Sequence, residues 1–167
     1  MNITLIGMPG AGKSYIGKKL AAHLEFVCLE IDEILEKEYR LPLPLVVAKL
    51  GDRKFLQKEA EVVISQTRDR NDLVISPGGS MVYRAHAMKH LKKNSKIIYL
   101  KVPLQVIEKR IGGAPRGIIG AKKKPFKDIY AERTPLYEKY ADHTINGDRA
   151  AEEVVADILR ILLLAEK

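Results

Sequence analysis

Residues 7–14 constrain the fold of this chain more than any other segment. They read Gly-Met-Pro-Gly-Ala-Gly-Lys-Ser and match the phosphate-loop pattern G-x-x-x-x-G-K-[ST]. Glycines in such a loop permit backbone torsions and close approaches that a Cβ would obstruct, so backbone N–H groups can surround an anion. A short apolar run, residues 2–7, precedes the loop, and a helical pattern, residues 13–24, follows it. This order predicts a nucleotide phosphate site and disfavours a chance glycine-rich turn.

Two side chains at the end of the loop are expected to carry phosphate chemistry. Lys13 can reach the β- and γ-phosphates of ATP, and the Ser14 hydroxyl can bind Mg²⁺. The helix that starts near Lys13 adds its positive dipole end. The nucleotide-binding residues predicted in this segment are Pro9, Gly10, Ala11, Gly12, Lys13, Ser14 and Tyr15.

The remainder of the chain alternates strand-like with helix-like segments, which favours an α/β fold with a parallel sheet. Near-continuous apolar runs are typical of parallel strands that are buried on both faces. The expected strands are residues 2–7, 26–31, 73–76, 96–100 and 144–145, and the expected helices are 13–24, a segment from 32, a stretch that ends near 66, 103–111, 129–139 and 150–165.

Two carboxylates, Glu30 and Asp32, stand at the carboxyl end of the second expected strand. Ligands of open α/β sheets bind outside the carboxyl ends of the strands. A phosphotransferase needs a metal partner and, when it phosphorylates an alcohol, a group that orients or deprotonates that alcohol. We therefore expect both carboxylates near the γ-phosphate. The alternatives are a helix N-cap for Asp32 and an exposed strand-end acid for Glu30.

Positive charge is concentrated in one part of the chain. The sequence contains 29 basic and 21 acidic side chains, a formal net charge of +8, but 10 lysines and two arginines lie within residues 89–127 beside a single acid. The three lysines at 122–124 are either a solvated surface or part of a basic segment that closes over an anion. Nucleic acid is disfavoured as a partner, because only Tyr99 and Phe126 in this stretch could stack on bases.

Length and composition limit the number of domains and the classes of protein to which the chain can belong. The 167 residues are enough for one substantial core, and we expect a single domain over residues 1–167. No uncharged apolar run reaches the roughly 18 residues of a membrane span, and the first residues lack the features of a signal peptide. The single cysteine, Cys28, excludes an intramolecular disulfide and fits a reducing compartment. We expect a cytoplasmic monomer without a membrane partner.

The sequence resembles the shikimate kinase family of small phosphate-loop kinases over most of its length. The segments that carry the resemblance are residues 7–14, Glu30 and Asp32, Gly-Asp-Arg-Lys-Phe-Leu-Gln-Lys-Glu at 51–59, Ser-Pro-Gly-Gly-Ser at 76–80, Arg110, Arg116, and Glu-Arg-Thr-Pro-Leu-Tyr at 132–137. The resemblance implies a three-layer α/β sandwich whose five-stranded parallel sheet has the order 2-3-1-4-5. It also implies ATP- and Mg²⁺-dependent phosphorylation of shikimate to shikimate 3-phosphate, with a lid at about 112–127 and an acceptor-binding helical region at about 32–60.

The family pattern implies roles for the acids and for the acceptor pocket. Ser14 and Glu30 would lie on the metal side, and Asp32 would bind the acceptor hydroxyl as the candidate base. A charge-assisted, bidentate pair would hold the acceptor carboxylate on an arginine. The residues implied to bind the acceptor are Asp32, Gly78, Gly79, Ser80 and, for the carboxylate, Arg133.

Three further arginines match family positions around the nucleotide. Arg110 would stack on adenine, and Arg149 would also contact the nucleotide. Arg116 would reach the transferring phosphate from the lid, where positive charge stabilises the developing negative charge. Together with Lys13 and Asp32, Arg116 completes the implied catalytic set.

Three features depart from the family pattern. Leu56 stands where the family has a second carboxylate-binding arginine, Ser80 replaces the last glycine of a three-glycine motif, and Gly117 and Ile118 follow Arg116 in place of Pro-Leu. The nucleotide half of the site is intact, and the acceptor half is altered. The alternative acceptor is therefore a different small polyol or hydroxy acid, and the distant alternative is a nucleotide- or nucleic-acid-binding module without turnover.

Overall fold

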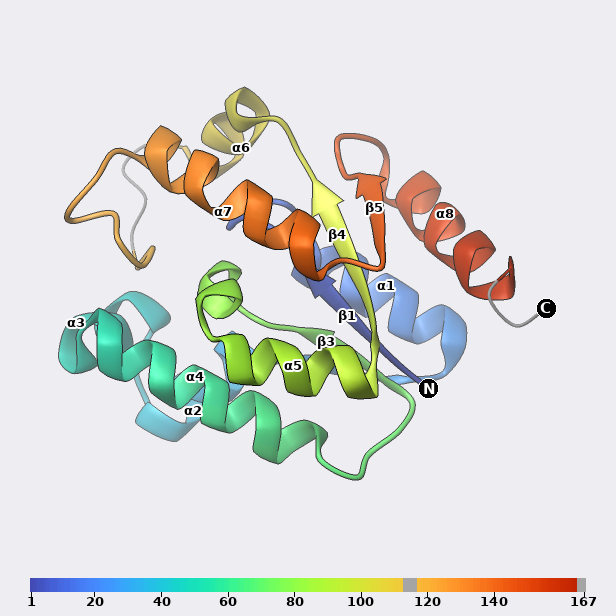
Figure 1. Cartoon of the computed structure of the whole chain (residues 1–167), viewed down its shortest axis with the longest axis horizontal. Coiled ribbons are helices and arrows are strands. Elements are labelled where there is room, and N and C mark those ends of the chain that lie inside the picture. The colour runs from blue at the N-terminus through green and yellow to red at the C-terminus, as the bar shows by residue number, and fades with distance from the viewer. Residues whose placement is uncertain (113–116, 165–167) are drawn as a thin grey trace.

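A five-stranded parallel sheet forms the centre of the computed structural model, which describes residues 1–112 and 117–164 (Figure 1). Its strand order, β2-β3-β1-β4-β5, confirms the order that the resemblance implied. The central strand is β1, in which Thr4 pairs with Ile75 on one side and with Ile97 on the other. The strands are β1 (Asn2–Ile6), β2 (Val27–Glu30), β3 (Leu73–Ser76), β4 (Lys96–Lys101) and β5 (His143–Asn146).

Helices cover both faces of the sheet and complete the three layers. α1 contacts β1, β2 and β3 and packs against α8, whereas α5 and α7 lie on the opposite face against β4 (Figure 1). α2, α3 and α4 pack on one another beside the site. The helices are α1 (Lys13–Leu24), α2 (Ile31–Tyr39), α3 (Leu43–Leu50), α4 (Asp52–Thr67), α5 (Ala85–Asn94), α6 (Leu104–Ile111), α7 (Phe126–Tyr140) and α8 (Ala151–Leu164), with a 3₁₀ turn, η1, at Gly79–Tyr83.

The strands are apolar because helices exclude water from both of their faces. Every residue of β1 and β3 is buried, and Ile3, Val74 and Ile97 have no exposed surface. β2 lies at an edge of the sheet, and its first residue, Val27, is accordingly exposed. None of the helices in residues 1–112 and 117–164 is sufficiently long and apolar to span a membrane.

The expected elements are present, α5 is an additional helix that was not predicted, and several boundaries differ from expectation; α7, for example, begins at Phe126 and not at residue 129. α2 begins at Ile31, directly after β2, so that Glu30 occupies the N-cap position. The alternative of Asp32 as the N-cap is therefore wrong, because this residue already lies in the first helical turn. The helical stretch that ends near residue 66 consists of α3 and α4, since Gly51 between them has a φ of 76°, which interrupts the helix and favours glycine.

Part of the expected lid lies against the acceptor-side helices. The N–H of Gly120 donates to Asp52 Oδ2 at the start of α4, over 3.1 Å. Gly117 has a φ of 71°, and a Cβ at this position would lie 3.1 Å from Pro44 Cα in α3. Residues 113–116, which include the predicted lid residue Arg116, lie outside the described residues.

Candidate active site

A cavity of about 410 Å³ lies where the carboxyl end of β3 meets the phosphate loop. α2, α4 and α7 and residues 117–119 supply its other walls. Most of the predicted site residues line it, namely Pro9, Gly10, Gly12, Lys13, Ser14, Tyr15, Asp32, Gly78, Gly79, Ser80 and Arg133. The cavity therefore brings together the residues predicted for the nucleotide and for the acceptor, which are up to 124 positions apart in the chain.

The phosphate loop adopts backbone torsions that glycine permits. Gly10 and Gly12 have φ values of 82° and 92°, and a Cβ at Gly10 would lie 2.9 Å from Ile111 Cγ2. Lys13 is the first residue of α1 and curls back over the loop, where its ammonium donates to the carbonyls of Gly7 (2.9 Å) and Met8 (3.0 Å). Burial lowers the pKa of Lys13 to about 8. An anion in the loop would favour the charged ammonium and offset this effect.

Ser14 and Glu30 lie side by side at the start of α1 and the end of β2. The Ser14 hydroxyl donates to Glu30 Oε2 over 2.8 Å, and the carboxylate is only 7% exposed, whereas Ser14 is open to solvent. Oxygen ligands of this kind suit Mg²⁺, which in nucleotide sites uses few protein ligands and completes its shell with phosphate oxygens and water. The two residues therefore fit the metal position predicted for them.

Two acidic side chains approach each other at the acceptor end of the cavity. Glu59 of α4 has no exposed surface, and Asp32 Oδ1 is buried without a hydrogen-bond partner among the described residues. A Cβ added to Gly78 would lie 2.3 Å from Glu59 Oε1 and 3.3 Å from Asp32 Oδ1, so both carboxyl groups flank this glycine. Burial raises the pKa of Asp32 to about 6 and that of Glu59 to about 8, and the charge of Asp32 adds to the second effect.

The turn after β3 is held by the same buried acid. Glu59 accepts hydrogen bonds from the Gly78 N–H (2.9 Å) and from the Ser80 hydroxyl (3.1 Å). Gly78 therefore donates its N–H within the protein, and its contribution to the cavity is the space that a side chain would fill. Ser80, which was predicted to bind the acceptor, lines the cavity, but its hydroxyl is engaged by Glu59 and the residue is 5% exposed.

Glu59 is a site residue that the prediction from sequence did not single out. A signal was present, because Glu59 follows Phe55 by one helical turn and precedes Val62 and Val63 on the buried face of α4. A lone acid on the apolar face of a helix needs buried hydrogen-bond partners. Nothing in the sequence, however, indicates that the turn after β3 supplies them.

Arg133 is the cation at the acceptor end of the cavity. It is 1% exposed, and its Nη2 donates to the carbonyl of Ile119 over 2.8 Å. Its Nε donates to the Tyr83 hydroxyl over 3.3 Å, and its guanidinium carbon lies 5.1 Å from the centre of the Tyr83 ring. The side chain is thus fixed between the described end of the lid and the turn after β3.

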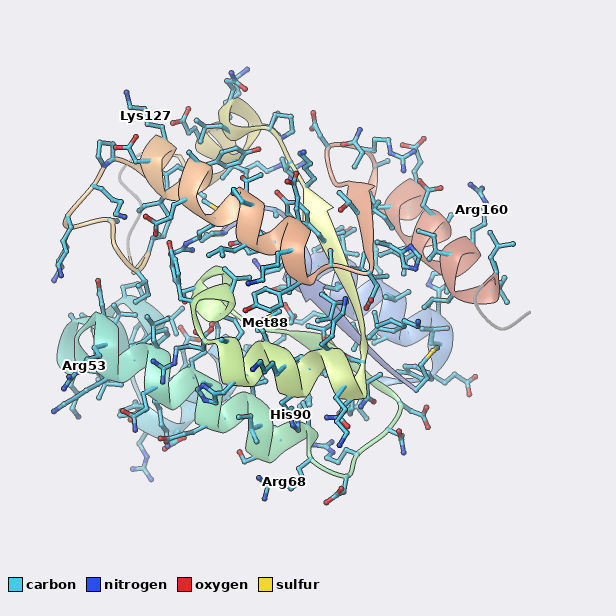
Figure 2. The ribbon with its side chains drawn as sticks, viewed as in Figure 1. Arg53, Arg68, Met88, His90, Lys127 and Arg160 are labelled. Carbon is cyan, nitrogen blue, oxygen red and sulfur yellow. The ribbon has the colours of Figure 1, made fainter. Side chains whose placement is uncertain are left out.

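Among the described residues, no other arginine takes over the role of the family arginine that Leu56 replaces. Leu56 is half-buried against the core and does not line the cavity, whereas its neighbour Phe55 does. Arg53, in the first turn of α4, is exposed and points outward at the end of the helical group (Figure 2). Arg133 is therefore the only arginine among the described residues that line the cavity.

The remaining predicted nucleotide residues lie outside the cavity lining. Arg110 of α6 lies next to the phosphate loop, with its Nη1 3.3 Å from the Gly10 carbonyl. Arg149 instead pairs with Asp157 of α8 and borders a separate shallow depression between β5 and α8. Ala11 is buried within the loop.

The lysine-rich segment does not enter the cavity. Lys122 and Lys123 are exposed, Lys124 forms an ion pair with Glu132, and none of the three contributes to the cavity wall. Lys127, in the first turn of α7, points outward at the edge of the molecule (Figure 2). The solvated-surface interpretation therefore fits these lysines in this structure.

Comparisons with known proteins agree with the geometry of the site. A model of the shikimate kinase family matches residues 9–163. A shikimate kinase from Caldanaerobacter subterraneus subsp. tengcongensis is 33% identical over 163 residues, which cover 95% of this chain and 94% of that protein. A shikimate kinase from Aquifex aeolicus is 29% identical over 160 residues, with 95% and 94% of the two chains covered.

Solved structures show the same fold. A shikimate kinase from Acinetobacter baumannii in complex with shikimate superposes with a TM-score of 0.88 at 28% identity, over 98% of this chain and 93% of that chain. The APS kinase of Mycobacterium tuberculosis superposes with a TM-score of 0.62 at 17% identity, over 96% of each chain, and shows the fold alone.

Proposed function

Because the chain belongs to the shikimate kinase family, we propose that it transfers the γ-phosphoryl group of ATP to a ring hydroxyl of shikimate, giving shikimate 3-phosphate and ADP. The observation that carries the proposal is the unpartnered Asp32 Oδ1, which lies in one cavity with the phosphate loop and with Arg133. An acceptor bound by Arg133 at one end can therefore present a hydroxyl to Asp32 beside the nucleotide.

On the nucleotide side, backbone N–H groups of the phosphate loop and the amino end of α1 bind the phosphates. Lys13 exchanges its bonds to the Gly7 and Met8 carbonyls for bonds to the β- and γ-phosphates. Arg110 flanks the adenine, and Arg149 assists if its pair with Asp157 opens. We assign to Arg116, which lies outside the described residues, stabilisation of the charge that develops on the transferring phosphate.

Mg²⁺ would be held by Ser14, with Glu30 behind it, and would neutralise charge on the phosphate oxygens as the phosphoryl group moves. The Ser14 hydroxyl donates its proton to Glu30, which leaves the lone pairs of the serine oxygen available to a metal ion. Because Glu30 is buried, its negative charge acts at short range on the metal position.

On the acceptor side, Asp32 accepts the proton of the attacking hydroxyl. Its pKa of about 6 leaves it ionised at neutral pH and basic enough to orient or deprotonate an alcohol. Arg133 binds the carboxylate of the acceptor, and the backbone of Gly79 and Ser80 forms the adjacent wall. Ile118 and Ile119 cover the acceptor from the lid side and exclude water.

A different small polyol or hydroxy acid is the alternative acceptor, and the absence of a second arginine at Leu56 favours it. One assay separates the two candidates: ADP release from the purified protein with Mg-ATP and shikimate, then with a panel of polyols, hydroxy acids and nucleoside monophosphates. We expect saturable turnover with shikimate. Turnover with another acceptor and none with shikimate would refute the proposed acceptor while leaving the kinase activity intact.

We also propose that the enzyme acts in the cytoplasm as a monomer. The single thiol, Cys28, is half-buried, and burial raises its pKa to about 11, so it is a packing residue and not a reactive one. The exposed large apolar side chains of the described residues are spread over several elements and do not form one broad patch. Light scattering of the purified protein should give the mass of one chain, about 18.7 kDa.

A further inference from the structure

Arg133 is buried without forming an ion pair with any described residue. Its two hydrogen bonds go to neutral oxygens, the Ile119 carbonyl and the Tyr83 hydroxyl. A buried cation needs such bonds to compensate for the water it has lost. Because neither partner carries a negative charge, the guanidinium charge remains available to an incoming anion.

Tyr83 supports Arg133 in two ways. Its ring lies under the guanidinium group, with 5.1 Å between the guanidinium carbon and the ring centre, and its hydroxyl accepts a hydrogen bond from Nε. The same hydroxyl donates its proton to Glu132 Oε1 over 2.5 Å. A phenol has one proton, so this bond leaves the oxygen lone pair facing Arg133.

The support is built from the elements that form the acceptor end of the cavity. Tyr83 is the last residue of η1, and η1 begins with Gly79 and Ser80 in the cavity wall. Glu132 precedes Arg133 on α7 and is itself paired with Lys124. Through Tyr83, the η1 turn in the cavity wall is thereby connected to Arg133, the cation at the acceptor end of the cavity.

We propose that Tyr83 is a positioning residue for acceptor recognition, which holds Arg133 in the orientation that receives the acceptor carboxylate. This inference deepens the proposed function and rests on it. Where two arginines share a carboxylate, each limits the movement of the other. In this chain Leu56 stands at the position of the second arginine, so the orientation of Arg133 depends on Tyr83 and on Ile119.

The positioning itself can be measured without any acceptor, through the Nε–H signal of Arg133 in ¹⁵N NMR spectra of the whole protein. Arg133→Lys identifies the signal by removing it. We expect Tyr83→Phe, which keeps the ring but loses the hydroxyl, to shift this signal and to speed its exchange with water. The matched control is Tyr130→Phe on α7, the helix that also carries Arg133. This variant likewise loses one hydroxyl hydrogen bond, to the Val102 carbonyl at 3.0 Å, and should leave the Arg133 signal unchanged. An unchanged Arg133 signal in Tyr83→Phe would refute the positioning role.

The consequence for recognition is measured with shikimate and with its uncharged methyl ester. For Tyr83→Phe we expect the KM for shikimate to rise by about tenfold or more, as for loss of one hydrogen bond to a charged group, with kcat and the KM for ATP within about twofold. For Tyr83→Leu, which also loses the ring, we expect a larger rise. The KM for the ester should change little, because the ester lacks the charge that Arg133 binds.

An equal rise of KM for shikimate and for its ester would show that Tyr83 merely stabilises the pocket, and would overturn the inference. Absence of shikimate turnover by the wild-type protein would refute the proposed function instead. In that case the NMR comparison still decides whether Tyr83 positions Arg133. The two failures are therefore distinguishable.

Discussion

Replacement of Glu59 by glutamine should make the protein more stable at alkaline pH while leaving its stability in mild acid nearly unchanged. The glutamine has almost the same shape, and its amide oxygen can still accept from the Gly78 N–H while its NH₂ group donates to the Ser80 oxygen. Only the charge that Glu59 acquires at high pH is removed.

The magnitude follows from burial of the carboxyl group. Burial raises the pKa of Glu59 from 4.5 to about 8, so between these pH values the folded state retains a proton that the unfolded chain has lost. Stability from this group is therefore complete below about pH 4.5 and falls as the pH rises. By pH 8 the loss is on the order of 4 kcal/mol. The Glu59→Gln variant does not lose this stability, because glutamine does not ionise. For a chain of this size, its Tm at pH 8 should therefore exceed that of the wild type by roughly 10 °C.

The assay is thermal and urea unfolding of both proteins at pH 5, 6.5 and 8. The variant should match the wild type within about 1 kcal/mol at pH 5 and exceed it increasingly toward pH 8. Glu61→Gln, on the exposed face of the same helix, is the matched control and should show no such divergence. A difference between Glu59→Gln and wild type that stays constant over this range would refute the argument, because Glu59 would then be hydrated or paired with a cation.

The other predictions concern turnover and the acceptor pocket. Asp32→Asn should reduce kcat by about 100-fold or more, and the kcat/KM of the wild type should rise with pH through about 6, as the Asp32 carboxyl loses its proton; near-full activity of the variant would refute its role as the base. Leu56→Arg should lower the KM for shikimate by about tenfold through a second charge-assisted contact, and an unchanged KM would show that α4 turns this position away from the acceptor. Gly78→Ala should raise the KM for the acceptor and destabilise the fold by about 1–3 kcal/mol, because its Cβ would lie 2.3 Å from Glu59 Oε1; steady-state kinetics and urea unfolding at neutral pH check both effects, and wild-type values would contradict the contact.

The sequence indicated the strand, loop and helix order around the phosphate loop, because these segments are local. The phosphate loop, the strand before it and the helix after it are consecutive, so the spacing of Gly7, Gly12 and Lys13 reports their arrangement directly. The carboxylates after β2 were also placed correctly at the carboxyl end of the sheet. The exact start of α2 was not, since Glu30 and not Asp32 precedes the first helical residue.

The acceptor half depends on contacts between distant segments. Glu59 meets Gly78 and Ser80 across 19 and 21 positions, and Tyr83 meets Arg133 across 50. No periodicity reports such pairings, because hydrophobic patterns indicate only which face of a helix is buried. The resemblance to shikimate kinases placed Arg133 near the acceptor, but the residue that supports it became visible only in the folded chain.

The sequence by itself determined the class of this protein: alternating apolar runs and helices indicate a layered α/β fold, and a glycine-rich loop between a strand and a helix indicates an anion-binding site. The tertiary structure decided the electrostatics of the pocket. Burial raises the pKa values of Asp32 and Glu59, and only the packing of α4 against the turn after β3 buries the second of them completely. The free energy of a charge depends on the water and the dipoles around it, and these are properties of the folded molecule and not of the chain.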